Sequence, residues 1–230
     1  MNKISVIVPC YNEEESLTAF HRETAAVLKK IEEADYEFVF VDDGSSDKTL
    51  EIIKELAAED SHVRYVAFSR NFGKEAGMYA GLSEASGDYM VIMDADLQHP
   101  PALLPAMYEA VSKEGYDLCG GLRMGREGDS KLRGIFSRAF YKVSKKLTHM
   151  DMSDGHGDFR MMNRKVAEAI LEMKEYNRYM KGLFSFVGFD TKWIEYESVE
   201  RVMGKSKWNF KSLFSYAFEG ILSFSTAPLK

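Results

Sequence analysis

The sequence predicts an α/β fold in which a mostly parallel sheet is flanked by helices on both faces. Over roughly the first half of the chain, short apolar runs rich in β-branched residues alternate with segments of helical spacing. The apolar runs are continuous, which is typical of parallel strands buried on both faces. Clusters of polar residues follow the ends of these runs, and such sheets bind ligands beyond the carboxyl ends of their strands. We therefore expect one active-site edge.

Strands and helices are expected to alternate up to residue 121. Helix 13–34 is predicted because apolar residues recur in it at helical spacing, and helix 101–112 because proline suits the first turn of a helix. The predicted elements are strand 4–9, helix 13–34, strand 36–41, helix 47–58, strand 63–68, helix 74–86, strand 89–93, helix 101–112 and strand 117–121.

The remainder of the chain differs in character. We expect a catalytic domain over residues 1–200 and an amphipathic segment over residues 201–230, with no internal repeat. The features after residue 121 are a basic stretch at 123–150, a loop rich in glycine and acids at 155–159, a helix at 163–173, a strand at 191–199, a basic stretch at 201–211 and apolar residues at helical spacing over 210–224.

Composition excludes several classes of protein. The 230 residues are 45% hydrophobic, which is enough for a folded core, and the formal net charge of -6 argues against a general nucleic-acid binder. The only cysteines, Cys10 and Cys119, lie in predicted strands, so a disulfide scaffold is excluded and a reduced, cytosolic setting is expected. No apolar stretch reaches the ~18 residues of a membrane span, and the first apolar run is too short for a signal peptide.

The strongest chemical signal is Asp94-Ala95-Asp96, followed by Gln98, directly after a predicted buried strand. Two carboxylates at the end of an apolar strand repel each other and are costly to desolvate together. A divalent cation with oxygen ligands removes that cost and can hold a diphosphate. A turn or helix cap is the alternative, because aspartate is favoured there and Pro100-Pro101 follows.

Two further clusters follow the first and second predicted strands. Asp42-Asp43 precedes Gly44, and one of these acids could accept a hydrogen bond from a nucleobase. Tyr11 offers a ring for stacking on the base, and Asn12 could cap the next helix. The neighbouring Ser45, Ser46 and Asp47 are explained by capping alone.

The end of the third strand carries Ser69-Arg70-Asn71-Phe72-Gly73-Lys74, a glycine turn with cations. This segment could face phosphates or cap a helix. No Gly-x-Gly-x-x-Gly follows the first strand, and no Gly-x-x-x-x-Gly-Lys-Ser/Thr occurs, so dinucleotide-binding and P-loop folds are disfavoured.

In order, these motifs resemble family 2 of the inverting glycosyltransferases, which have the Rossmann-like GT-A fold. Within that family the chain is most similar to the polyprenyl-phosphate glycosyltransferases, the group of dolichol-phosphate mannose synthase and the bactoprenol glucosyltransferases. The resemblance covers nearly the whole chain. The segments that carry it are Pro9-Cys10-Tyr11-Asn12-Glu13-Glu14, Val41-Asp42-Asp43-Gly44-Ser45, Ser69-Arg70-Asn71-Phe72-Gly73-Lys74-Glu75, Asp94-Ala95-Asp96-Leu97-Gln98 and Gly157-Asp158-Phe159-Arg160.

The resemblance implies a role for each matching position. Asp158 matches the acid near the acceptor that is often called the catalytic base. Asp94, Asp96 and Gln98 match the motif that binds Mg²⁺ or Mn²⁺ and the diphosphate. The nucleotide-sugar positions are Pro9, Tyr11, Glu13, Asp43, Lys74 and Asp94, and the phosphate-closing positions are Arg201, Gly204, Ser206 and Lys207.

The implied reaction is transfer of a hexose from a UDP- or GDP-sugar to a polyprenyl phosphate, with inversion, at the cytoplasmic face of a membrane. A saccharide acceptor, as in cell-surface polysaccharide synthesis, is the alternative reaction, and an inactive membrane scaffold is the alternative without catalysis. The sugar, the base, the metal and the oligomeric state, including a possible homo-oligomer, stay open.

Two departures from the family accompany the resemblance. His99 stands where the family often has an acid. Bactoprenol-type relatives continue into two transmembrane helices, and this chain ends where they would begin.

The chemical nature of the acceptor determines whether the reaction needs a catalytic base. A lipid phosphate with a second pKa near ~6 is largely ionised at neutral pH, so it hardly needs a base. Asp158 is then expected mainly to position the acceptor or the sugar and to remove any residual proton. A plain loop aspartate is the alternative for Asp158.

A membrane-borne acceptor is also favoured by the basic half of the chain. Residues 131–150 carry six basic side chains and no acid, on an apolar helical pattern typical of interfacial helices. Such a stripe can instead pack on the core with a solvated basic face. Arg123 and Arg138 are candidates to hold the acceptor phosphate, with surface arginines as the alternative.

Overall fold

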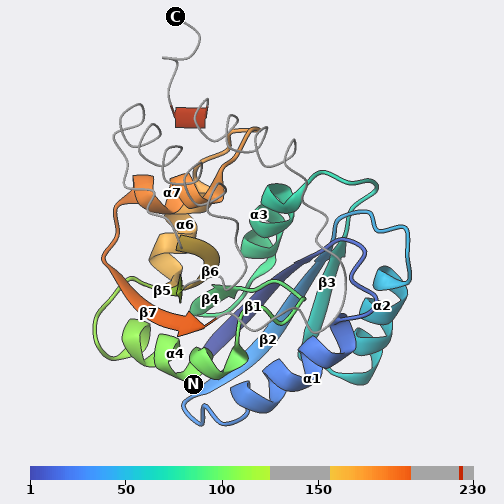
Figure 1. The fold of residues 1–230 in the computed structure, drawn as a ribbon, viewed down its shortest axis with the longest axis horizontal. Helices are drawn as coiled ribbons and strands as arrows, with labels where there is room; N and C mark the ends of the chain where they lie inside the picture. Colours follow the sequence, from blue (N-terminus) through green and yellow to red (C-terminus); the bar gives the residue numbers. More distant parts are fainter. Residues whose placement is uncertain (125–155, 198–222, 225–230) are drawn as a thin grey trace, which may run out of the picture.

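The computed structural model describes residues 1–124, 156–197 and 223–224 (Figure 1). These residues form a sheet with the strand order β3-β2-β1-β4-β6-β5-β7. The strands are β1 (Asn2–Cys10), β2 (Ala34–Asp42), β3 (Val63–Ala67), β4 (Tyr89–Ile92), β5 (Leu118–Met124), β6 (His156–Asn163) and β7 (Thr191–Glu197). The helices are α1 (Leu17–Leu28), α2 (Thr49–Glu59), α3 (Lys74–Glu84), α4 (Leu104–Ser112), α6 (Arg164–Leu171) and α7 (Met180–Val187), and η1 (Pro101–Leu103) is a 3₁₀ turn before α4.

The predicted mostly parallel sheet is confirmed. Strands β3, β2, β1 and β4 are parallel neighbours, and β7 is parallel to β5. Strand β6 departs from this pattern, because it lies between β4 and β5 and is antiparallel to both. The inserted strand brings a late part of the sequence into the centre of the sheet.

The expectation of a loop at residues 155–159 is wrong for most of that segment, because β6 begins at His156. The alternation of its side chains explains the strand. Phe159 and Met161 join the buried cluster on one face of the sheet, and Met162 joins the cluster on the other. Both faces of β6 are therefore buried, and a glycine-rich stretch is held extended by packing.

Two helical layers cover the sheet (Figure 1). Helices α1, α2 and α4 pack on one face through residues such as Phe20, Ile53 and Met107. Helices α3, α6 and α7 pack on the other face through residues such as Met78, Ile170 and Leu183.

Helix α3 lies unusually close to the sheet. A Cβ added at Gly81 would lie 2.3 Å from Cγ2 of Ile7, and one at Gly77 would lie 3.1 Å from Cβ of Pro9. The helix can sit this close only because both positions lack a side chain. Its first residue, Lys74, is thereby placed over the carboxyl ends of the central strands.

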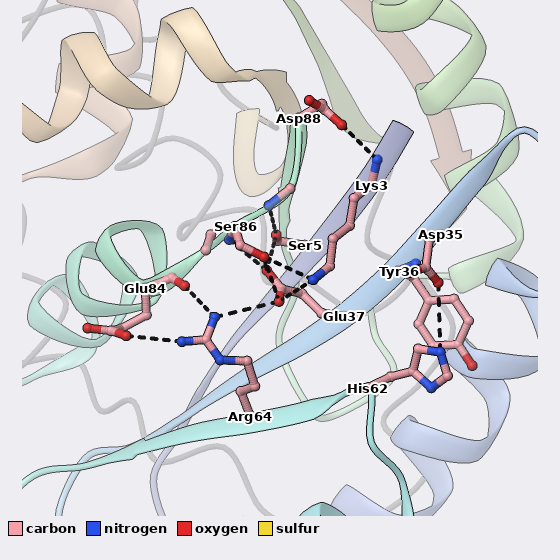
Figure 2. Close-up of polar contacts among 12 residues, drawn as sticks. Lys3, Ser5, Asp35, Tyr36, Glu37, His62, Arg64, Glu84, Ser86 and Asp88 are labelled. Atoms are coloured by element: carbon pink, nitrogen blue, oxygen red, sulfur yellow. Dashed lines mark hydrogen bonds and ion pairs between the residues drawn. The ribbon is translucent and has the colours of Figure 1, made fainter. Parts of the chain in front are cut away.

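A polar network ties the opposite edge of the sheet together (Figure 2). The buried carboxylate of Glu37 accepts hydrogen bonds from the Ser5 hydroxyl at 2.6 Å and from the Ser86 N–H at 2.7 Å, and Lys3 Nζ lies 2.9 Å away. Burial alone would raise the pKa of Glu37, but the hydrogen bonds from Ser5, Lys3 and Ser86 outweigh it and lower the pKa to about 2. This network joins β1, β2 and the loop before β4.

Several boundaries differ from those expected. The first helix is shorter than predicted, because it begins at Leu17 with Ser16 at its N-cap position, so Asn12 does not cap it. Helix 163–173 is confirmed as α6, which Asn163 caps by accepting the Val166 N–H. Helix α7 had not been expected. The basic stretch after Met124, the segment 201–211, most of 210–224 and the expected boundary at residue 200 lie outside the described residues.

Candidate active site

The ladder between β4 and β6 brings two predicted site residues to one edge of the sheet. The last pair of this antiparallel ladder is Ile92 with Arg160. Continuing the same register by two residues places Asp94 opposite Asp158. Because β6 starts at the edge where β4 ends, residues 64 positions apart in the sequence become neighbours.

Lys74 joins these two carboxylates. Its Nζ lies 2.7 Å from Oδ1 of Asp94 and 2.9 Å from Oδ2 of Asp158. The other oxygen of Asp158, Oδ1, is buried and has no hydrogen-bond partner within the described residues. The structure therefore unites three predicted residues and leaves one buried oxygen of Asp158 available to a ligand.

Cations keep both acids ionised. Burial alone would raise the pKa of Asp158, but Lys74, Lys181 and Arg160 outweigh it and hold that pKa well below its usual range. Burial likewise opposes ionisation of Asp94, and Lys74 is the main group that lowers its pKa. A carboxylate with so low a pKa is a weak proton acceptor at neutral pH.

The loop after β4 is tightly closed. Oδ1 of Asp96 accepts the N–H of Gln98 at 3.1 Å, and Leu97 between them has a φ of 60°. Nδ1 of His99 accepts the N–H of Asp94 at 3.1 Å. Asp96 is buried, whereas Asp94 and Gln98 are partly exposed.

The oxygen atoms of this loop suit a magnesium or manganese ion. The described residues contain no group of three His, Cys, Asp or Glu side chains that could hold a metal by themselves. Mg²⁺ is commonly bound by one or two carboxylates together with substrate phosphates, so that it needs no all-protein cage. The Lys74 ammonium already neutralises Asp94, so a metal ion that binds this carboxylate has to displace Lys74 or share the carboxylate with it. The donor set fits a cation that is held jointly with a diphosphate.

Asp43 organises the loop that precedes Lys74. Its two carboxylate oxygens accept the N–H of Phe72 at 2.6 Å and the N–H of Gly73 at 2.9 Å. Gly73 has a φ of 95°, a conformation that favours glycine, and α3 starts at the next residue. Contact between Asp43 and a nucleobase stays a prediction. What the structure shows is that its carboxylate holds the Lys74 loop.

The loops after β1 and β2 are joined by hydrogen bonds. The N–H of Asn12 donates to Oγ of Ser45 at 2.9 Å, and the N–H of Ser46 donates to Oδ1 of Asn12 at 2.8 Å. Pro9 lies at the end of β1, Tyr11 is 40% exposed just after it, and the N–H of Glu13 donates to Thr49 at 2.8 Å. Three of the four predicted nucleoside positions, Pro9, Tyr11 and Glu13, therefore lie at the end of β1 or in the braced loop after it.

Only one of the predicted acceptor residues lies in the described part of the chain. Arg123 is partly buried near the carboxyl end of β5. Since β5 and β4 are both antiparallel to β6, Arg123 lies at the same edge of the sheet as Asp94. Arg138, Arg201, Ser206 and Lys207 lie outside the described residues.

Arg160 is a residue for which the sequence had suggested no role. Its buried guanidinium lies 4.6 Å from the ring centre of Phe184 and 5.0 Å from that of Trp193, and its Nε donates to the carbonyl of Gly157 at 3.0 Å. Burial lowers its pKa to about 10. Arg160 thus braces the start of β6, which carries Asp158. In the sequence, the only feature that pointed to Arg160 was its position two residues after Asp158 in the motif Gly157-Asp158-Phe159-Arg160.

Helix α7 also escaped sequence analysis, although it borders the site. Its first N–H, from Met180, donates to Oε2 of Glu75 on α3 at 2.8 Å. The next residue, Lys181, is among the cations that lower the pKa of Asp158. These contacts depend on the packing of α7 against α6 and β6, which no local pattern encodes.

Comparison with known proteins identifies the family and the fold. The profile of glycosyl transferase family 2 matches residues 5–171. The chain is 46% identical over 227 residues to the putative glycosyltransferase CsbB of Bacillus subtilis (strain 168), covering 99% of this chain and 68% of that protein. It is 41% identical over 228 residues to the bactoprenol glucosyl transferase of Shigella phage SfV, covering 99% and 74%.

Solved structures share the fold at low sequence identity. Glucosyl-3-phosphoglycerate synthase from Mycobacterium tuberculosis, in complex with Mn²⁺ and UDP-glucose, superimposes with a TM-score of 0.60 at 18% identity, covering 94% of this chain and 76% of that one. The mannosyltransferase PcManGT from Pyrobaculum calidifontis, in complex with GDP-Man and Mn²⁺, also has a TM-score of 0.60 at 18% identity, covering 89% and 58%.

Proposed function

Because the chain belongs to glycosyltransferase family 2, we propose that it transfers a hexose from a nucleoside diphosphate sugar to a polyprenyl phosphate and inverts the anomeric centre. The observation that carries the proposal is the group formed by Asp94, Lys74 and Asp158 at one edge of the sheet. Such a group can hold a diphosphate on one side and orient a reacting sugar on the other.

A phosphate acceptor agrees with the state of Asp158. A sugar hydroxyl is a poor nucleophile and needs a good base, whereas a phosphate monoester is already largely ionised at neutral pH. Lys74, Lys181 and Arg160 together lower the pKa of Asp158 and make it a weak base. Its buried Oδ1 is instead suited to accept a hydrogen bond from the donor sugar and so to orient it. Relatives named bactoprenol glucosyl transferase support the same class of acceptor.

Asp94, Asp96 and Gln98 would hold Mg²⁺ or Mn²⁺ jointly with the donor diphosphate. When bound, the metal supplies positive charge that stabilises the departing nucleoside diphosphate. The carboxylate and amide oxygens of the loop support this assignment. Two proteins of the same fold that were solved with Mn²⁺ also support it.

The chain's own residues would bind the rest of the donor and the acceptor phosphate. Lys74 stands at the amino end of α3, where the helix dipole and free N–H groups favour phosphate. We assign the nucleoside to the braced loops after β1 and β2, and the acceptor phosphate to Arg123 together with four residues that lie outside the described part of the chain. The assigned residues are Pro9, Tyr11, Glu13 and Asp43 for the nucleoside, and Arg123, Arg138, Arg201, Ser206 and Lys207 for the acceptor.

We propose that the reaction takes place at the cytoplasmic face of a bacterial inner membrane. Within residues 1–124, 156–197 and 223–224, no helix has the length and apolar character needed to cross a bilayer. The basic amphipathic pattern at 131–150 and the segment 201–230 support docking on the surface, since each cation near anionic lipid contributes on the order of 1 kcal/mol. Flotation with anionic liposomes at low salt tests this, and a chain that stays at the bottom of the gradient overturns it.

The reaction is tested with a panel of UDP- and GDP-sugars, polyprenyl phosphate and either Mg²⁺ or Mn²⁺. Radiolabel extracted into organic solvent supports the proposal, and label found only on an added saccharide supports the alternative acceptor. If no sugar is transferred under any condition and calorimetry detects no nucleotide binding, both proposed reactions are overturned and an inactive membrane scaffold is favoured.

The pH dependence of the Asp158→Asn variant also distinguishes a phosphate acceptor from a saccharide acceptor. With a phosphate acceptor, part of the activity should survive at alkaline pH, where the acceptor is fully ionised. Asp88→Asn is the matched control, because Asp88 is exposed and lies near Lys3 at the opposite edge of the sheet. Complete loss at every pH with donor binding intact would contradict the proposal that Asp158 removes only a residual proton from the acceptor.

A further inference from the structure

His99 contacts the loop of Asp94 and Asp96 from within. The residue is 9% exposed, and its Nδ1 accepts the N–H of Asp94 at 3.1 Å. An Nδ1 that accepts a hydrogen bond carries no proton, so the proton of the neutral ring is on Nε2. Together with the bond from Gln98 to Asp96, this contact closes the loop at both ends.

The other side of the His99 ring rests on the strand of Asp158. The ring stacks on Phe159 with centroids 4.9 Å apart and an interplanar angle of 7°. Phe159 is fully buried and meets the ring of Tyr196 edge-on at 6.0 Å. Phe159 is the neighbour of Asp158 in β6. A displacement of His99 would therefore shift both the loop of Asp94 and the start of β6 that carries Asp158.

The two links between Asp94 and β6 lie on opposite faces of the sheet. Successive side chains of a strand point to opposite faces, so Phe159 faces away from Asp158. On the α3 face, Lys74 joins the two acids through a flexible side chain that a donor phosphate can attract. On the other face, His99 is held by burial, stacking and a hydrogen bond. Of these two side-chain links, the His99 link does not depend on whether Lys74 stays in place.

We propose that His99 is a positioning residue: it fixes Asp94 relative to Asp158 while Lys74 turns to the donor diphosphate. The roles of the two acids rest on the proposed function, whereas the contacts of His99 do not. The expected effect follows from the behaviour of groups that orient metal ligands, whose loss commonly weakens metal binding or activity about 10- to 100-fold.

Two substitutions separate the hydrogen bond from the packing. His99→Phe keeps a ring on Phe159 and removes the acceptor for the Asp94 N–H. His99→Asn removes the ring but places an amide oxygen near the position of Nδ1. We expect His99→Phe to weaken Mn²⁺ binding, followed by electron paramagnetic resonance, about tenfold, and to lower kcat more than it raises the KM for the acceptor. His99→Asn should recover most of the Mn²⁺ affinity.

His62 provides a matched control at the opposite edge of the sheet. Its ring stacks on Tyr36 at 4.5 Å and 17° (Figure 2). Its Nδ1 lies 2.7 Å from Asp60 Oδ1, so His62 combines stacking and a polar contact as His99 does. His62→Phe should leave Mn²⁺ binding and kcat unchanged. Equal losses in His62→Phe and His99→Phe would reduce the effect to general destabilisation and overturn the proposal.

Hydrogen exchange distinguishes failure of this inference from failure of the proposed function. His99→Phe should speed amide exchange over residues 94–99 and 156–159, whatever the reaction proves to be. If the wild type transfers sugar and binds Mn²⁺ but His99→Phe matches it in all measurements, the inference is wrong. If the wild type neither transfers sugar nor binds Mn²⁺, amide exchange in His99→Phe decides the inference by itself. Exchange that is unchanged from the wild type overturns it, and faster exchange confined to residues 94–99 and 156–159 supports it. Should His99→Phe not fold, Phe159→Leu removes the stacked ring from the other side and should give the same pattern.

Discussion

The ammonium of Lys74 lies 2.7 Å from Oδ1 of Asp94, the carboxylate that the metal assignment requires. An internal cation therefore already neutralises this acid before any ligand arrives. A divalent ion that binds Asp94 has to compete with Lys74, and a donor diphosphate gives Lys74 a new anionic partner as it does so.

Lys74→Met should therefore raise the affinity for Mn²⁺ in the absence of donor while lowering the affinity for the nucleotide sugar. The gain is expected to be roughly fivefold, corresponding to about 1 kcal/mol for a partly exposed ion pair. Paramagnetic resonance titration and calorimetry measure the two affinities. Lys113→Met, which removes an exposed ion pair with Glu33, is the control. Weaker Mn²⁺ binding in Lys74→Met would show that the two cations do not compete.

Glu37 should make the stability of the fold sensitive to acid. The pKa of Glu37 is about 2 in the folded state, below the ordinary value of 4.5. The ionised carboxylate therefore adds its full contribution to the free energy of unfolding above pH 4.5, and this contribution disappears as the pH falls toward 2. The difference corresponds to about 3 kcal/mol. Glu37→Gln should be less stable than the wild type by about this amount at pH 7, and the gap should narrow between pH 4.5 and 2.

Urea unfolding at a series of pH values measures this gap. Glu33→Gln is the matched control, because Glu33 forms an exposed ion pair with Lys113 and lies outside the Glu37 network. A gap between wild type and Glu37→Gln that stays constant from pH 7 to pH 3 would contradict the prediction.

Asp43→Asn should disturb the Lys74 loop. An amide cannot accept both the Phe72 and the Gly73 N–H through two oxygens, so one partly buried donor loses its partner at a cost of about 1 kcal/mol. We expect faster amide exchange over residues 69–73 and a higher KM for the donor. Asp35→Asn, at the other end of β2, is the control. A changed preference for the base without faster loop exchange would assign Asp43 to the nucleobase alone.

Gly120→Ala should destabilise the protein by about 1–3 kcal/mol through overpacking. A Cβ at this position would lie 2.3 Å from Cζ3 of Trp193, and Trp193 also packs against Arg160, the ladder partner of Gly120. Gly157→Ala is the comparison, since the nearest atom to its Cβ would be 3.8 Å away. Thermal unfolding measures both variants, and equal melting temperatures would show that Trp193 can move aside freely.

The sequence alone was sufficient to predict the layered α/β architecture and the edge of the sheet at which the candidate active site lies. Continuous apolar runs ended in polar clusters at residues such as Asp43 and Asp94, and strand and helix patterns of this kind are written in neighbouring residues. The family followed from the order of short motifs. Residues 131–150 and 201–222, on which the membrane interpretation depends, lie outside the described part of the structure.

Only the tertiary structure decided which residues meet. A stretch that looked like a loop became β6 because both of its faces are buried, and its register with β4 set Asp158 opposite Asp94. The same packing placed Lys74 between the two acids and His99 behind them. Periodicity reports which side of a single element is buried. The pairing of elements far apart in the chain depends on how their buried faces fit, and that information is spread over the whole core.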